Sequence, residues 1–382
     1  ERGLRQGRMG WKGGIFSGGM MSLIKKLGHR YNTLRKDNEV PAKSSIQPGE
    51  MKQPKQKKND PTDIYILVHG LGGRPGDLSY LQRCLKRQNP TAIVHLARCN
   101  SASPLMTFDG VRKGGQRLSE EIKTLVASYP SLTRISLVGN SLGGIYCRYA
   151  MGLLYDHRKG RIAGLKPHKF LTTATPHLGV GIYGYMGAIP PFLQKFAAQT
   201  LVGTTIRELL LLDDDKSPLL AQLSGVSVSP GSLPFMKALA SFKERCAYAN
   251  AVNDFMVAYK TAHPSGPLDS GQNLGSEIGS DIGSDIGSGI VSRKFLPGSE
   301  RGGNMSVGSH LIKDRRHLMH VMSRSLTSLP WHQVTVEFPG PLPLAHNKIC
   351  ALERDPLQTW LNSGGRPVVE DQAKWLADAH DC

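Results

Sequence analysis

One serine of the chain lies in a pattern that is typical of a nucleophile. Gly139-Asn140-Ser141-Leu142-Gly143 has the spacing G-x-S-x-G, which occurs once in the sequence. An apolar segment precedes the pattern and a helical one follows it, as in the strand–turn–helix context of a nucleophile elbow. Such a turn holds the hydroxyl clear of the backbone and leaves room only for very small side chains beside it. The pattern also suits a glycine-rich turn that binds phosphate, and the flanking segments favour Ser141 as a nucleophile.

A serine hydroxyl is a poor nucleophile unless a histidine accepts its proton and an acid orients that histidine. In proteins with such an elbow, the acid follows the serine along the chain and the histidine follows the acid. Asp254 lies just beyond the apolar residues 246–250, at the expected end of a strand. The competing acidic residues 213–215 follow an apolar helical stretch, which is typical of a solvated helix end. We therefore predict Asp254 as the acid.

The histidine that would act as the base is selected by its position. The histidines that follow Asp254 are His263, His310, His317, His320, His332, His346 and His380. His346 lies in the loop after the predicted strand over residues 334–338, where the base is expected. His69 precedes the nucleophile, so we expect it to brace its loop. His177 precedes the acid, so we expect it to be structural or to line a pocket. The prediction for the base is His346.

Acyl transfer also needs two N–H groups that stabilise the oxyanion formed on the attacked carbonyl. One is expected from the residue after the nucleophile, which is Leu142. The other is expected from the loop after an early strand, here residues 69–73 with the sequence His-Gly-Leu-Gly-Gly. We predict the backbone of Leu71 as this second donor.

Strands and helices must alternate to place these groups at one edge of a sheet. Short apolar runs predict strands over residues 64–68, 92–96, 135–138, 170–173, 246–250 and 334–338. Helical patterns occupy residues 77–88, 110–129, 142–155 and 368–379. This alternation predicts an α/β protein with a mostly parallel, doubly wound sheet.

Composition divides the chain further. Residues 1–62 are basic and without sustained periodicity, and we expect a disordered tail there. Residues 63–382 are predicted to form one domain, interrupted by a Gly/Ser-rich insertion at about 265–310 that is typical of a flexible loop. The apolar residues 180–212 follow a predicted strand, and we expect a cap over the site there. An ordinary pair of core helices would explain the same residues.

Charge and cysteine content exclude some classes of function. The net charge is +18, and about half of the excess lies in the first 60 residues. This charge lacks the interleaved aromatic residues or modules of a nucleic-acid-binding protein, so we expect no nucleic acid partner. The six cysteines form no C-x-x-C pair, and there is no apolar run long enough for a membrane span. We therefore expect an intracellular protein, in the cytoplasm or an organelle such as a plastid, without metal, cofactor or obligate protein partner.

Together, several segments resemble the putative serine esterase (lipase-type) family of α/β-hydrolases in plants and fungi. They are residues 68–71 (Val-His-Gly-Leu), 138–144, 148–150 (Arg-Tyr-Ala), 174–179, 248–250, 253–254 and 345–347. The resemblance covers residues 63–263 and resumes near 330–352. It implies the α/β-hydrolase fold, with Ser141, Asp254 and His346 as the triad. The chain departs from the family in its Gly/Ser insertion and in residues 255–258.

The resemblance implies hydrolysis of a carboxylic ester, with a lipid such as a monoacylglycerol or a lysophospholipid as the expected substrate. The reaction would pass through an acyl-enzyme on Ser141. Two alternatives remain open at this point. One is a non-catalytic protein that keeps the fold and uses its basic tail for peripheral contact with anionic membranes. The other is an acyltransferase that uses the same triad.

Overall fold

The computed structural model describes residues 60–182, 203–226, 232–266, 289–299, 314–340 and 343–378. The chain separates into two units, Glu1–Gln56 and Lys57–Cys382, and all described residues belong to the second. The predicted tail over residues 1–62 lies almost wholly outside the described residues, so the predicted domain limits stay predictions.

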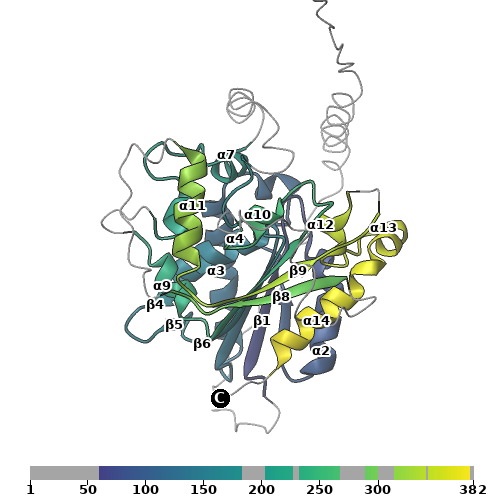
Figure 1. Cartoon of the computed structure of the whole chain (residues 1–382). Helices are drawn as coiled ribbons and strands as arrows, with labels where there is room; N and C mark the ends of the chain where they lie inside the picture. Colours follow the sequence, from purple (N-terminus) through teal and green to yellow (C-terminus); the bar gives the residue numbers. More distant parts are fainter. Residues whose placement is uncertain are drawn as a thin grey trace, which may run out of the picture. The chain divides into compact units, whose positions relative to one another are not determined.

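A sheet of seven strands forms the centre of the described part (Figure 1). In spatial order the strands are β2 (Ile93–Leu96), β1 (Asp63–Val68), β3 (Arg134–Asn140), β6 (Lys166–Thr173), β7 (Glu244–Asn250), β9 (Trp331–Val336) and β8 (Ile290–Leu296). Every neighbouring pair is parallel except β8, which runs antiparallel to β9. The predicted mostly parallel sheet is confirmed.

Two apolar layers bury the two faces of this sheet. On β1, Ile64 and Ile66 belong to one buried cluster, whereas Tyr65 and Leu67 belong to the other. The first cluster includes residues of α3 (Val111–Ser128), α4 (Leu142–Leu154), α9 (Phe235–Ala240) and α11 (Arg315–Leu326). The second includes residues of α2 (Ser79–Gln88) and α14 (Arg366–Ala377), which lie on the other side of the sheet in Figure 1. Strands buried on both faces have continuous apolar sequences, which explains why these were recognisable.

Smaller elements complete the described part. They are the hairpin of β4 (Tyr155–Asp156) and β5 (Arg161–Ile162), the 3₁₀ turns η2 (Pro75–Leu78), η3 (Pro104–Thr107) and η4 (Ser363–Gly365), and the short helices α7 (Thr204–Leu209), α8 (Leu219–Leu223), α10 (Tyr259–Ala262), α12 (Ala345–Lys348) and α13 (Pro356–Leu361). None of the described helices is long and apolar enough to cross a membrane. The cysteines within the described ranges are free thiols.

Two predicted segments are only partly described. Of the predicted insertion, residues 267–288 and 300–310 lie outside the described residues, while Ile290–Leu296 between them form the edge strand β8. This strand differs from the irregular stretch expected there. Of the predicted cap, residues 183–202 lie outside the described residues and the remaining end contains α7. The cap therefore stays a prediction.

Candidate active site

Ser141 lies in a sharp turn between β3 and α4. Its φ of 54° and ψ of −127° are unusual for a residue with a side chain, and its backbone N–H donates to the carbonyl of Thr173 at 2.8 Å. The glycines on either side are needed because of close approaches. A Cβ at Gly139 would collide with the backbone of Gly144, and one at Gly143 would collide with the carbonyl of Val68. The turn is therefore a packed strand-to-helix elbow.

Asp254 and His346 form a buried pair at the same edge of the sheet. Asp254 follows β7 and His346 lies in α12, after β9. The imidazole Nδ1 lies 3.1 Å from Oδ1 and 3.0 Å from Oδ2 of the carboxylate. Only 2% of the Asp254 side chain and 6% of the His346 side chain are exposed. With Nδ1 held by the acid, Nε2 of His346 is left to exchange a proton with another group.

The two loops that carry this pair are joined by their backbones. Asp254 and Leu344 form an isolated antiparallel bridge, and the N–H of Ala345 donates to the carbonyl of Asn253 at 3.3 Å. Asn253 has a left-handed φ of 61°, and its amide donates to the carbonyls of Phe338 and Gly340, each at 3.1 Å. These contacts bring the acid and the histidine together although they are 92 residues apart in the chain.

Hydrogen bonds hold the Asp254 carboxylate in place. The side-chain amide of Asn250 donates to Oδ2 at 2.7 Å, and the backbone N–H groups of Met256 and Val257 donate to Oδ1 at 3.0 and 2.9 Å. Burial by itself raises the pKa of Asp254, but the attraction of His346 and these hydrogen bonds outweigh it and lower the pKa below its ordinary value. The carboxylate therefore stays ionised beside the imidazole.

The loop after β1 lies against the nucleophile. A Cβ at Gly70 would lie 2.8 Å from Cβ and 3.2 Å from Oγ of Ser141. In this loop the N–H of Gly73 donates to the carbonyl of Gly70 at 3.0 Å, and that of Gly72 donates to Oγ1 of Thr107 at 2.9 Å. No described residue accepts the N–H of Leu71. Within the described part of the chain, this N–H has no competitor for a substrate oxygen.

Leu142 offers a second N–H in the same neighbourhood. It is the first residue of α4, and the first N–H groups of a helix have no acceptor within the helix. The positive end of the helix dipole also favours negative charge at this point. The predicted oxyanion donors thus belong to two backbone segments that meet at Ser141.

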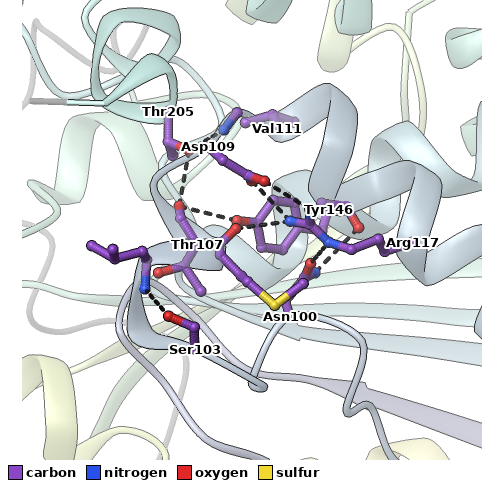
Figure 2. A network of polar contacts seen from close by, with 12 residues as sticks. Asn100, Ser103, Thr107, Asp109, Val111, Arg117, Tyr146 and Thr205 are labelled. Atoms are coloured by element: carbon purple, nitrogen blue, oxygen red, sulfur yellow. Dashed lines mark hydrogen bonds and ion pairs between the residues drawn. The ribbon is translucent and has the colours of Figure 1, made fainter. Parts of the chain in front are cut away.

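Thr107 connects the loop after β1 to a partly buried polar network, shown in Figure 2. Its carbonyl accepts hydrogen bonds from the hydroxyl of Thr205 at 2.8 Å and from that of Tyr146 at 3.2 Å. Nearby, Arg117 donates to Asn100, Asp109 and the carbonyl of Met106 at 2.7 to 2.8 Å. The network fixes the segment before α3, and through Thr107 it fixes Gly72.

The residues considered as competitors have other partners. His69 is buried with Nδ1 3.1 Å from the carbonyl of Gly70, and burial lowers its pKa. His177 is fully buried, with Nε2 2.9 Å from the hydroxyl of Thr172, and burial lowers its pKa well below the ordinary value. Asp213 accepts the backbone N–H of Leu219 at 2.9 Å. None of these groups contacts the Asp254–His346 pair.

The structure thus joins Asp254 to His346, and Ser141 to the loop of Leu71. Between the hydroxyl of Ser141 and the imidazole of His346 there is no hydrogen bond. Such contacts are often long in proteins without substrate and tighten when it binds.

The sequence analysis missed Asn250 and Thr107 as supports of the site. Asn250 stands in a segment of the family resemblance, whereas Thr107 has no local signal. The described residues contain no cluster of histidine, cysteine or acidic side chains that could hold a metal.

The sheet order, the helices on both faces and the elbow after β3 define an α/β-hydrolase fold, as predicted. Residues 58–266 match the family described as "Putative serine esterase (DUF676)", and the chain belongs to this family. The family resemblance inferred from the motifs is confirmed.

Two fungal relatives share part of the sequence. The putative lipase C4A8.10 of Schizosaccharomyces pombe is 30% identical over 210 residues, which are 52% of this chain and 26% of the relative. The putative lipase ROG1 of Saccharomyces cerevisiae is 30% identical over 220 residues, which are 56% of this chain and 30% of the relative. The chain therefore spans less than a third of the length of these relatives.

Two solved structures are also similar. The lin2722 gene product of Listeria innocua has a TM-score of 0.38 at 11% identity, covering 85% of this chain and 96% of that one. The lipase BlEst2 of Bacillus licheniformis in its propeptide form has a TM-score of 0.32 at 13% identity, covering 52% of this chain and 37% of that one.

Proposed function

We propose that the protein is a serine hydrolase that cleaves a carboxylic ester of a lipid. The observation that carries the proposal is the ionised Asp254 carboxylate bonded to Nδ1 of His346, at the sheet edge where the Ser141 elbow lies. A serine in an elbow, followed along the chain by an acid and then by a histidine, supplies the parts that nucleophilic acyl transfer requires.

The geometry supports a two-step reaction. Ser141 Oγ attacks the acyl carbonyl while its proton passes to Nε2 of His346, because Nδ1 faces the acid. The negative charge on the carbonyl oxygen is stabilised by the N–H groups of Leu71 and Leu142. His346 then protonates the departing alcohol and leaves an acyl group on Ser141. A water molecule, activated by the same histidine, releases the carboxylic acid and restores the serine.

A lipid is the proposed substrate class because apolar side chains are exposed on loops at this edge. Leu105 follows β2, and Val252 and Phe255 flank the acid after β7. Their exposed fractions are 56%, 43% and 47%. Large apolar groups that stay in water near a site are typical of contact with an apolar ligand or a membrane surface. The names of the two fungal relatives, putative lipases, agree with this choice.

The test is the hydrolysis of a series of 4-nitrophenyl and monoacylglycerol esters of increasing chain length. We expect the wild type to hydrolyse esters, with a preference for long acyl chains, and Ser141→Ala to lose the activity. Ser119→Ala is the matched control, because Ser119 is also buried but lies on α3 and bonds only to its own helix. An inactive wild type, or full activity in Ser141→Ala, would overturn the proposal. If an alcohol is added to the assay and a new ester of that alcohol forms faster than free acid, the reaction is acyl transfer instead.

A further inference from the structure

A basic hollow lies at the edge of the sheet opposite the candidate active site. Its volume is about 430 Å³, and it is lined by residues of the β4–β5 hairpin, the start of β6 and the turn before β7. The lining residues are Lys159, Gly160, Arg161, Lys166, Pro167, Ser241 and Lys243. The amino ends of the parallel strands β6 and β7 meet here, whereas Ser141, Asp254 and His346 follow carboxyl ends. In Figure 1 the hairpin lies far from α10 and α12.

The charge of this hollow is of one sign. Four of the described lining side chains are basic and none is acidic. The carboxylate of Asp156, in the same hairpin, is occupied by the backbone N–H groups of Arg158 and Lys159 at 2.9 and 3.3 Å. Asp156 does not line the hollow.

Burial and nearby cations act on one neighbour of the hollow, His168. His168 is buried on β6 beside the hollow, and burial is the first cause that lowers its pKa. The cations Arg134, Lys169 and Lys243 lower the pKa further, whereas Asp63 raises it. Of these cations, Lys243 lines the hollow, whereas Arg134 and Lys169 lie outside its lining. Like charges brought together repel each other, and a bound anion would relieve the repulsion.

We propose that this hollow binds a compact polyanion that carries two or more phosphate groups. Its volume lies within the range of small-molecule sites, roughly 300–1,000 Å³, and its concave shape suits a small ligand better than an extended nucleic acid. Lysine and arginine are the side chains that bind phosphate oxygens through charge-assisted hydrogen bonds. Because the hollow and the candidate active site are at opposite edges, this ligand is distinct from the ester that is cleaved. The proposal does not depend on the hydrolytic function.

The phosphates could belong to a soluble molecule or to a lipid headgroup, and the experiment distinguishes the two sources. In one arm, inorganic tripolyphosphate is titrated into the full chain by calorimetry. In the other, the full chain is sedimented with phosphatidylcholine vesicles that contain phosphatidylinositol bisphosphate. Both arms compare the wild type with the pair Lys166→Gln and Lys243→Gln. The control is the pair Lys86→Gln and Lys113→Gln, which removes the same charge from exposed positions outside the hollow.

We expect the pair in the hollow to weaken binding about tenfold or more, because charge-assisted hydrogen bonds are lost, while the control keeps wild-type affinity. A loss confined to the tripolyphosphate arm assigns a soluble ligand, and a loss in the vesicle arm assigns a headgroup. Equal losses in both pairs would show general attraction by the basic chain and would overturn the proposal. Absence of binding in both arms would overturn it as well. All four substituted lysines are exposed, and thermal melts check that each pair folds.

Discussion

Replacing Thr107 by valine tests how the oxyanion loop is held. The change keeps the shape of the side chain but removes the hydroxyl oxygen that accepts the N–H of Gly72 at 2.9 Å. Gly72 has a left-handed φ of 60°, and its neighbour Leu71 carries the proposed oxyanion donor. Thr107 is fully buried, so water has little access to replace the lost oxygen. We expect the loop to lose its fixed orientation.

The size of the effect follows from the lost hydrogen bond. A buried donor left without an acceptor costs about 1–3 kcal/mol. If about 1–2 kcal/mol of this cost raises the free energy of the transition state relative to the ground state, the rate falls roughly 5- to 30-fold. This conversion uses about 1.4 kcal/mol for each factor of ten in rate. Substrate binding in the ground state uses the oxyanion donors little, so kcat should fall while KM changes little.

The assay is the second-order rate of labelling by a fluorophosphonate, together with kcat and KM for an ester that the wild type hydrolyses. Thr107→Ser keeps the hydroxyl and should restore most of the rate. Thr205→Val is the matched control, because Thr205 donates to the same residue but does not contact the loop after β1. A folded Thr107→Val with the wild-type rate would refute the reasoning, as would an equal loss in Thr205→Val.

Three further changes test other parts of the account. Gly70→Ala places a Cβ 2.8 Å from Cβ of Ser141 and should slow labelling about tenfold or more, whereas Gly76→Ala, with nothing within 4 Å, should label normally. Asp254→Asn should lower kcat on the order of 10⁴-fold, and near-normal turnover would show that another residue is the acid. Burial raises the pKa of Glu208 from 4.5 to about 7, so the folded state holds its proton more tightly than the unfolded chain. The tighter proton binding contributes fully to the stability of the fold below the pKa of Glu208 in the unfolded chain, 4.5, and this contribution is lost as the pH rises through about 7. As the pH rises from about 5 to about 8, the free energy of unfolding of Glu208→Gln should therefore increase relative to that of the wild type by on the order of 2 kcal/mol. Denaturant melts measure this difference, and a gain that does not vary with pH would contradict it.

The sequence predicted secondary structure best for the strands that are buried on both faces of the sheet. In the strands over residues 63–68 and 244–250, residues 64–68 and 246–249 are apolar because helices cover both faces of the sheet. Each strand was predicted within two residues of its observed bounds. The elbow at Ser141 was recognisable because its glycines are needed at fixed positions around a strained residue. The pairing of Asp254 with His346 followed from chain order.

Other features depend on contacts that leave no local pattern. The edge strand β8 contains Arg293 and Lys294 and is paired on one side only, so its sequence lacks the continuous apolar run of the inner strands. Thr107 supports Gly72 from 35 residues away, and its role depends on how two loops meet. Asn250 is an ordinary polar residue at a strand end until the fold brings the carboxylate of Asp254 to its amide.

The most direct test of the central claim is peptide mapping by mass spectrometry after the protein reacts with a fluorophosphonate. The account predicts one phosphonyl group, on Ser141, which is absent in Ser141→Ala and forms much more slowly in His346→Ala. Modification of a different residue in the folded wild type, or no modification of Ser141, would contradict it.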